Sequence, residues 1–140
     1  MYKDALRAAW AEINITNLDF NIKQIKEKVG SGVKITGVVK ADAYGHGSVR
    51  VATVLRANGI ESFAVATLSE AVRLRKAGFL LEEIMVLSPI PEPYIDTIIE
   101  HRLSPVVCDY KNAEAISKAA AAAGIIIKGR SEERRVGKEC

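Results

Sequence analysis

The sequence predicts an α/β fold in which helices cover a parallel sheet. Short apolar runs recur along the chain, at 34–39, 62–66, 84–87, 104–108 and 125–128. The runs are continuously apolar, which is typical of parallel strands buried on both faces. Helix-like segments with their own start and stop signals separate the runs. An open doubly wound sheet and a (β/α) barrel both satisfy this pattern.

The first helix is predicted to run from a capping-box pattern at Thr16 and Asp19 to a stop at Gly30. Its apolar residues recur at steps of three and four, which places them on one face. These residues are Leu18, Ile22, Ile25 and Val29. Ahead of this helix, the segment WAEINI at 10–15 is a further candidate strand.

The later helices show the same start and stop signals. A second helix ends at the Asn-Gly pair 58–59, and a third opens with a capping box of Thr67 and Glu70 and closes at Gly78. A fourth helix follows a Pro-x-Pro pair. A fifth fills the alanine-rich stretch 112–124. Strand and helix therefore alternate along the chain.

The composition fits a globular protein of the reducing cytoplasm. Hydrophobic residues make up 49% of the chain and charged residues 26%. The 20 basic and 17 acidic residues are scattered along the chain, and the lack of a basic block argues against nucleic-acid binding. No segment has the roughly 18 apolar residues of a membrane span. Cys108 and Cys140 show no spacing typical of a metal site or a disulfide framework. The basic group of Arg73, Arg75 and Lys76 is expected to be a solvated helix face.

The last eleven residues, RSEERRVGKEC at 130–140, differ from the rest. They hold four basic and three acidic residues and almost nothing to bury. A solvated charged tail is the ordinary interpretation. The string also resembles a translated sequencing-adapter read-through, so we predict an artefactual or disordered tail. The predicted organisation is an N-terminal strand segment at 1–15, an α/β part at 16–129, and this tail.

One loop carries the candidate chemistry, VVKADAYGHG at 38–47. Lys40 follows an apolar run, at the end of a strand where α/β folds place ligand sites. Desolvation there would favour the neutral form of the amine, which can attack a carbonyl. That chemistry suits a Schiff base with a substrate or with pyridoxal phosphate. Tyr44 offers a hydroxyl to a phosphate, and a helix beginning near Ser48 would favour an anion. The alternative is a structural lysine with its charge in solvent beside a glycine-rich turn.

The same loop resembles the pyridoxal-phosphate lysine motif of bacterial alanine racemases. WAEINITNLDFNI resembles the opening of that family, and FAVATLSEAVRLRKAG resembles its second barrel unit. The likeness runs from about Ala9 to Gly129, and Ala9 stands where the family usually has threonine. It implies the first half of a (β/α)8 TIM-type barrel, followed in the whole protein by a β domain with which the strand at 10–15 pairs.

The resemblance also implies a function. Lys40 would hold pyridoxal 5'-phosphate and then act as one of two racemisation bases, and Tyr44 would bind the cofactor phosphate. The family interconverts L-alanine and D-alanine for peptidoglycan and works as a homodimer, with a tyrosine of the partner subunit as the second base. Since that base is not in this sequence, the fragment is predicted to be inactive alone.

Two alternatives to alanine racemisation remain open. One is a broader amino-acid racemase that acts on serine or lysine, because much of the substrate pocket lies outside this segment. The other is a non-catalytic pyridoxal-phosphate protein of the same barrel type, which keeps the lysine and lacks the β domain. The opening segment and the complete lysine motif favour the racemase.

Overall fold

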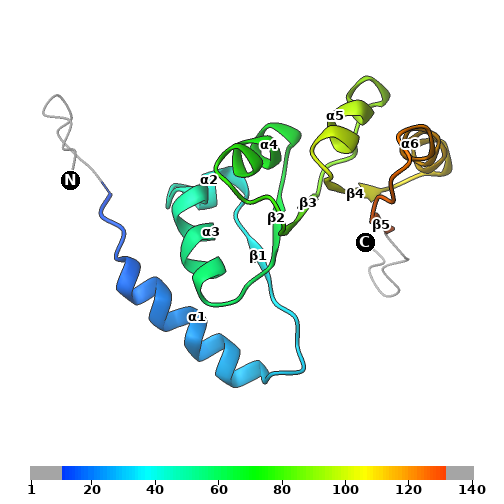
Figure 1. The fold of residues 1–140 in the computed structure, drawn as a ribbon. Coiled ribbons are helices and arrows are strands. Elements are labelled where there is room, and N and C mark those ends of the chain that lie inside the picture. Colours follow the sequence, from blue (N-terminus) through cyan, green and yellow to red (C-terminus); the bar gives the residue numbers. More distant parts are fainter. Residues whose placement is uncertain (1–10, 132–140) are drawn as a thin grey trace, which may run out of the picture.

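Five parallel strands form one sheet within residues 11–131, the part of the chain that the computed structural model describes (Figure 1). The strands are β1 Thr36–Val38, β2 Ser62–Val65, β3 Glu83–Val86, β4 Ser104–Val107 and β5 Arg130–Ser131. The helices are α1 Ile15–Val29, α2 Lys40–Tyr44, α3 Ser48–Ala57, α4 Leu68–Lys76, α5 Ile95–Glu100 and α6 Tyr110–Ala122, with a 3-10 helix η1 at Glu92–Tyr94.

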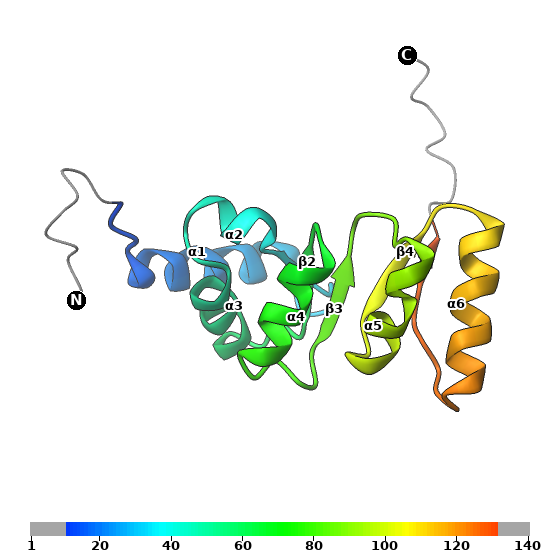
Figure 2. The ribbon, with the colours of Figure 1, turned by 90° about the horizontal axis from the view of Figure 1, so that it is seen from above.

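The strand order distinguishes the two architectures that the sequence allows. The sheet runs β1-β2-β3-β4-β5, with every pairing parallel and no reversal. A doubly wound sheet needs a point at which the order reverses, so that helices cover both faces. Right-handed crossovers between strands in unbroken order put the helices on one face instead. Figure 2 shows α3, α4, α5 and α6 following one another along the sheet. The α/β prediction is confirmed, as part of a barrel.

Side chains on the helix-facing side of the sheet form the core. Phe63 and Val65 of β2 and Ile84 and Val86 of β3 are fully buried. Phe79, after α4, meets Phe63 edge to face, with ring centroids 5.4 Å apart and planes at 82°. Burying a side chain of this size contributes about 1.5–3 kcal/mol, so these contacts hold the helices against the sheet.

A glycine lets α3 approach β1 closely. A β-carbon at Gly37 would lie 2.6 Å from Leu55 Cδ1 and 3.2 Å from Phe63 Cδ1. No larger residue fits there without movement of its neighbours. The strand that leads to Lys40 is therefore pressed against α3.

The opposite face carries several polar side chains. Paired positions of parallel strands share a face, and one such row joins Thr36, Ser62 and Glu83. Thr36 Oγ1 donates to Ser62 Oγ at 3.1 Å, and Ser104 Oγ donates to Glu83 Oε1 at 3.1 Å. Val38, in the next row, is 55% exposed. In the middle of the sheet, however, Ala64 and Met85 of this same face are buried, so the predicted burial on both faces holds for β2 and β3 and fails at the exposed Val38 of β1.

The predicted helix stops are confirmed, whereas the predicted start of α1 is wrong. Four glycines with positive φ follow helix ends, namely Gly30, Gly59, Gly78 and Gly124. The N-cap of α1 is Asn14 and not Thr16, because the Asn14 side chain accepts from Asn17 N at 3.0 Å. Asp19 instead accepts from Asn58 Nδ2 at 2.7 Å, which ties α1 to the end of α3.

The fifth strand lies later than the sequence predicts. Residues 125–128 carry no regular structure, and Ile126 is 95% exposed. β5 instead pairs Arg130 and Ser131 with Val106 and Val107. Two residues of the segment 130–140 thus join the sheet edge, and 132–140 lie outside the described residues.

The candidate strand at 10–15 is not seen as a strand. Trp10 lies outside the described residues, 11–14 carry no regular structure, and Ile15 begins α1. A strand needs a partner to pair with, and no described strand pairs with this segment. Its pairing with a β domain stays a prediction.

Candidate functional site

Lys40 lies two residues after β1, at the carboxyl end of the sheet. Val39 is fully buried, and its N–H donates to Ala64 O of β2 at 2.9 Å. Lys40 follows as the half-buried first residue of α2. Within residues 11–131, its amine has neither a hydrogen-bond partner nor an ion-pair partner. The structure therefore places an unpaired amine where the sequence predicts it, at the edge that carries ligand sites in barrels.

The turn that follows Lys40 is wound left-handed. Ala41, Asp42 and Ala43 have φ of 51–53° and ψ of 41–45°, and Tyr44 has φ of 51°. This conformation costs about 1–2 kcal/mol for each residue with a side chain, hence on the order of 4–8 kcal/mol for the turn. Such strain persists only where surrounding contacts enforce it, and it concentrates at functional sites.

Asp42 anchors the far end of this turn. Its Oδ1 accepts from Ser48 N at 2.8 Å and from Ser48 Oγ at 3.0 Å, and Arg73 Nη1 lies 3.2 Å away. The Ser48 N–H and then the Ser48 hydroxyl lower the pKa of Asp42, and the Arg73 charge acts in the same direction. The sequence allowed an external anion at the start of α3, and the structure places the chain's own carboxylate there instead.

Glu70 anchors the near end. Its Oε1 accepts from Ala41 N at 2.6 Å, directly after Lys40. Its Oε2 accepts from Ala66 N at 2.8 Å and from Thr67 N at 3.2 Å. The predicted capping box of Thr67 and Glu70 is confirmed, and the same carboxylate also reaches the lysine turn.

Tyr44 ends the turn and is 72% exposed. Among the described residues, none forms a hydrogen bond with its hydroxyl. Gly45 and Gly47, which follow, also have positive φ, of 86° and 85°. The structure thus brings Lys40 and Tyr44 into one five-residue element with a free hydroxyl at its end.

Sequence reasoning missed the residues that shape this turn. Glu70 was predicted as a helix cap only, and Arg73 as part of a solvated face. Alanine has no preference for left-handed backbone, so Ala41 and Ala43 give no warning of the conformation. Asp42 gives a weak signal, because aspartate tolerates that region and caps helix starts.

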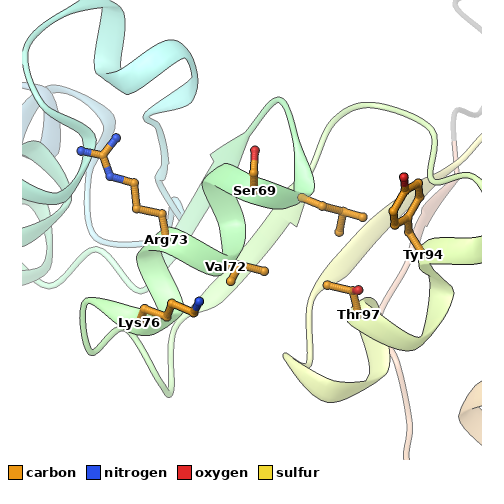
Figure 3. A pocket seen from close by; sticks show the side chains of 7 residues that line it. Ser69, Val72, Arg73, Lys76, Tyr94 and Thr97 are labelled. Atoms are coloured by element: carbon orange, nitrogen blue, oxygen red, sulfur yellow. The ribbon is translucent and has the colours of Figure 1, made fainter.

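One groove lies elsewhere, between α4 and the η1–α5 segment (Figure 3). It measures about 460 Å³ and is lined by Leu68, Ser69, Val72, Arg73, Lys76, Tyr94 and Thr97. In Figure 3 the Arg73 guanidinium points away from Tyr94 and Thr97. No residue of the lysine turn lines this groove, so it is not part of the candidate site.

The residues 11–131 hold no grouping of His, Cys, Asp and Glu suited to a metal ion. Over the same range, none of the helices combines the length and the apolar character that crossing a membrane needs. Cys108 is exposed.

Residues 13–139 match the family model described as alanine racemase, N-terminal domain. This chain belongs to the alanine racemase family. That family is pyridoxal-phosphate dependent, and its racemases are isomerases. The predicted family is confirmed, and the predicted cofactor and enzyme class are those of that family.

Curated alanine racemases agree with the family match. The alanine racemase of Clostridium kluyveri is 47% identical over 114 residues, which are 81% of this chain and 29% of the relative. Alanine racemase 1 of Clostridium acetobutylicum is 44% identical over 123 residues, 88% of this chain and 31% of the relative. The chain therefore spans less than a third of the length of these racemases.

Solved structures agree with the partial barrel. The alanine racemase of Clostridium difficile 630 superposes with a TM-score of 0.83 at 35% identity, over 90% of this chain and 33% of that one. A histidine racemase from Leuconostoc mesenteroides gives a TM-score of 0.71 at 27% identity, over 82% of this chain and 30% of that one. The fold of this segment is thus shared by racemases of different amino acids.

Proposed function

We propose that this chain is the N-terminal part of a pyridoxal-phosphate-dependent racemase that interconverts L-alanine and D-alanine. The observation that carries the proposal is the Lys40 amine, half-buried after β1 and unpaired within residues 11–131, at the start of a strained turn. Similarity to curated alanine racemases supports alanine as the substrate.

The residues of the lysine turn fit pyridoxal phosphate in two respects. A primary amine condenses with an aldehyde, so Lys40 would hold the cofactor covalently. The exposed Tyr44 hydroxyl would donate to the phosphate. The N-terminus of α3 is not offered as a phosphate site, because the Asp42 carboxylate already accepts from Ser48 N. The cofactor, when bound, supplies an electron sink for the negative charge that forms on the substrate α-carbon.

Lys40 has a second role in this proposal, as a base. Racemisation needs one proton-transfer group on each face of the α-carbon. Lys40 would take and return the proton on the face of the D-enantiomer. A tyrosine of the partner subunit's β domain would serve the other face, which makes the whole protein a homodimer.

The whole protein would supply D-alanine for peptidoglycan in the cytoplasm. Residues 16–129 would form the first half of its cofactor-binding barrel, and the segment 1–15 would pair with the β domain. We further propose that these 140 residues alone do not racemise alanine, since the second base and the other cofactor contacts lie in segments that this chain lacks. An assay of purified chain coupled to D-amino-acid oxidation should show no turnover, and turnover would refute this part of the proposal.

The role of Lys40 is tested by absorption spectroscopy. Adding pyridoxal phosphate to the chain should produce the visible band of the covalent lysine–cofactor bond, and Lys40→Ala should weaken it markedly. Lys34→Ala is the matched control, because Lys34 is an exposed lysine just before β1. A band of equal strength in Lys40→Ala would refute Lys40 as the attachment site.

One observation favours a second candidate, a racemase of another amino acid. The histidine racemase shares the fold of this segment, so the segment itself does not fix the substrate. The sequence-based alternatives of serine and lysine belong to the same class. Rates measured with alanine, histidine, serine and lysine on the complete protein would separate the candidates. Alanine should be turned over fastest.

A further inference from the structure

The Lys40 backbone is fixed by two anchors that come from different elements. On one side, Val39 N donates to Ala64 O at the end of β2. On the other, Ala41 N donates to Glu70 Oε1 at 2.6 Å. The turn closes through Ala43 N, which donates to Val39 O at 3.0 Å. The α-carbon that carries the amine therefore lies between two tethered amides.

The Glu70 carboxylate does more than a helix cap requires. A capping box needs one side-chain acceptor for the N–H of the N-cap residue, and Oε2 supplies it to Thr67. Oε2 also accepts from Ala66 N at the end of β2. The second oxygen, Oε1, is left over for Ala41, which is 29 residues away in sequence. This contact has no role in starting α4.

We infer that Glu70 is a positioning residue, whose carboxylate holds the backbone beside Lys40 and so fixes the direction of the amine. The inference rests on the proposed function, in which Lys40 condenses with pyridoxal phosphate. Glu70 is itself held by two amides of the β2–α4 junction, so its Oε1 is a fixed acceptor. A left-handed residue such as Ala41 relaxes when its amide loses such an acceptor.

Glu70→Gln separates the two roles of this side chain. Glutamine also completes a capping box, so its amide oxygen can accept from Ala66 and Thr67. Its amide NH2 group then faces Ala41 N, and two donors cannot bond to each other. The orientation with two satisfied amides is favoured over the one with a single satisfied amide. Glu70→Gln should therefore keep α4 and release the lysine turn.

Thr67→Ala is the matched control. It removes the hydroxyl that accepts from Glu70 N at 3.4 Å and so weakens the start of α4. All bonds that the Glu70 carboxylate accepts remain in this variant. An effect of general stability would appear in both variants, and an effect of positioning only in Glu70→Gln.

The experiment is site-resolved labelling of the 140-residue chain with pyridoxal phosphate. A lysine amine condenses with the aldehyde with loss of water, and borohydride then delivers hydride to the C=N carbon to leave a stable secondary amine. Peptide mapping by mass spectrometry gives the label at Lys40 relative to the exposed lysines Lys28 and Lys111. Amide hydrogen exchange at Ala41, without cofactor, gives a second readout.

In wild type, Lys40 should be labelled several-fold more than the reference lysines. Glu70→Gln should lower this ratio about three- to tenfold and speed Ala41 exchange about tenfold, whereas Thr67→Ala should leave both within twofold. An unchanged ratio in Glu70→Gln, with the wild-type preference intact, overturns the positioning role and leaves the proposed function standing. No preference for Lys40 in wild type overturns the proposed function itself.

Discussion

Replacing Arg75 by alanine should destabilise the fold more than any other change of a basic residue on α4. The guanidinium donates to four carbonyl oxygens in two loops. Nε and Nη2 donate to His101 O at 2.8 Å and to Arg102 O at 2.9 Å, before β4. Nη1 donates to Phe79 O and, at 2.8 Å, to Glu82 O, before β3. Burial lowers the pKa of Arg75, and the Glu82 carboxylate opposes that shift.

The size of the effect follows from these contacts. Breaking a fully buried charged cluster costs about 3–5 kcal/mol, and the partial exposure of Arg75 reduces this to roughly 2–3 kcal/mol. With a urea dependence of about 2 kcal/mol per M, the unfolding midpoint should fall by about 1–1.5 M. Circular dichroism during urea unfolding measures this shift. Arg75→Lys should lose about half as much, because one ammonium group cannot reach carbonyls in both loops.

Arg73→Ala is the control on the same helix. Arg73 pairs with Asp42 at the surface, with side-chain exposures of 58% and 45%, and such pairs contribute at most about 1 kcal/mol. Its midpoint should therefore fall by less than about 0.5 M. The reasoning is refuted if Arg75→Ala unfolds at the same urea concentration as Arg73→Ala.

Two further predictions concern the strand and the turn that carry the lysine. Gly37→Ala should cost about 1–3 kcal/mol in thermal unfolding, because its β-carbon would lie 2.6 Å from Leu55 Cδ1. Gly129→Ala, with no contact under 3.5 Å, should cost clearly less, and equal costs would contradict this account. The contacts with Ser48 lower the pKa of Asp42 from 3.8 in the folded chain. The ionised Asp42 carboxylate therefore stabilises the fold fully above pH 3.8, and this stabilisation is lost as the pH falls through the lower folded pKa. Between about pH 5 and pH 2 the urea midpoint of wild type should fall faster than that of Asp42→Asn. If both midpoints fall equally with pH, the Asp42 carboxylate does not stabilise the fold in this way.

Much of the fold could be predicted because the hydrophobic pattern and the residues that start and stop helices are local signals. Thr67 and Glu70 form the predicted cap, and four predicted apolar runs contain or overlap strands. Arg75 shows where local signals fail. Its charge among other charges indicates a solvated face, yet its partners are backbone carbonyls of two loops that no sequence pattern marks. The strand predicted at 125–128 is wrong for the opposite reason, since this segment is apolar and still lies at an exposed edge.

The contacts that shape the lysine turn are local to the first two strand–helix units. They join residues 39–48 to residues 64–73, through Ala64, Glu70 and Arg73. None of them involves β3, β4 or β5, so these contacts hold the backbone beside Lys40 without closure of the barrel. Cofactor affinity should be low, because Tyr44 is the one phosphate donor assigned among the described residues. It follows that this segment should direct an aldehyde to Lys40 selectively while holding it weakly, so selectivity and affinity should separate in the labelling experiment.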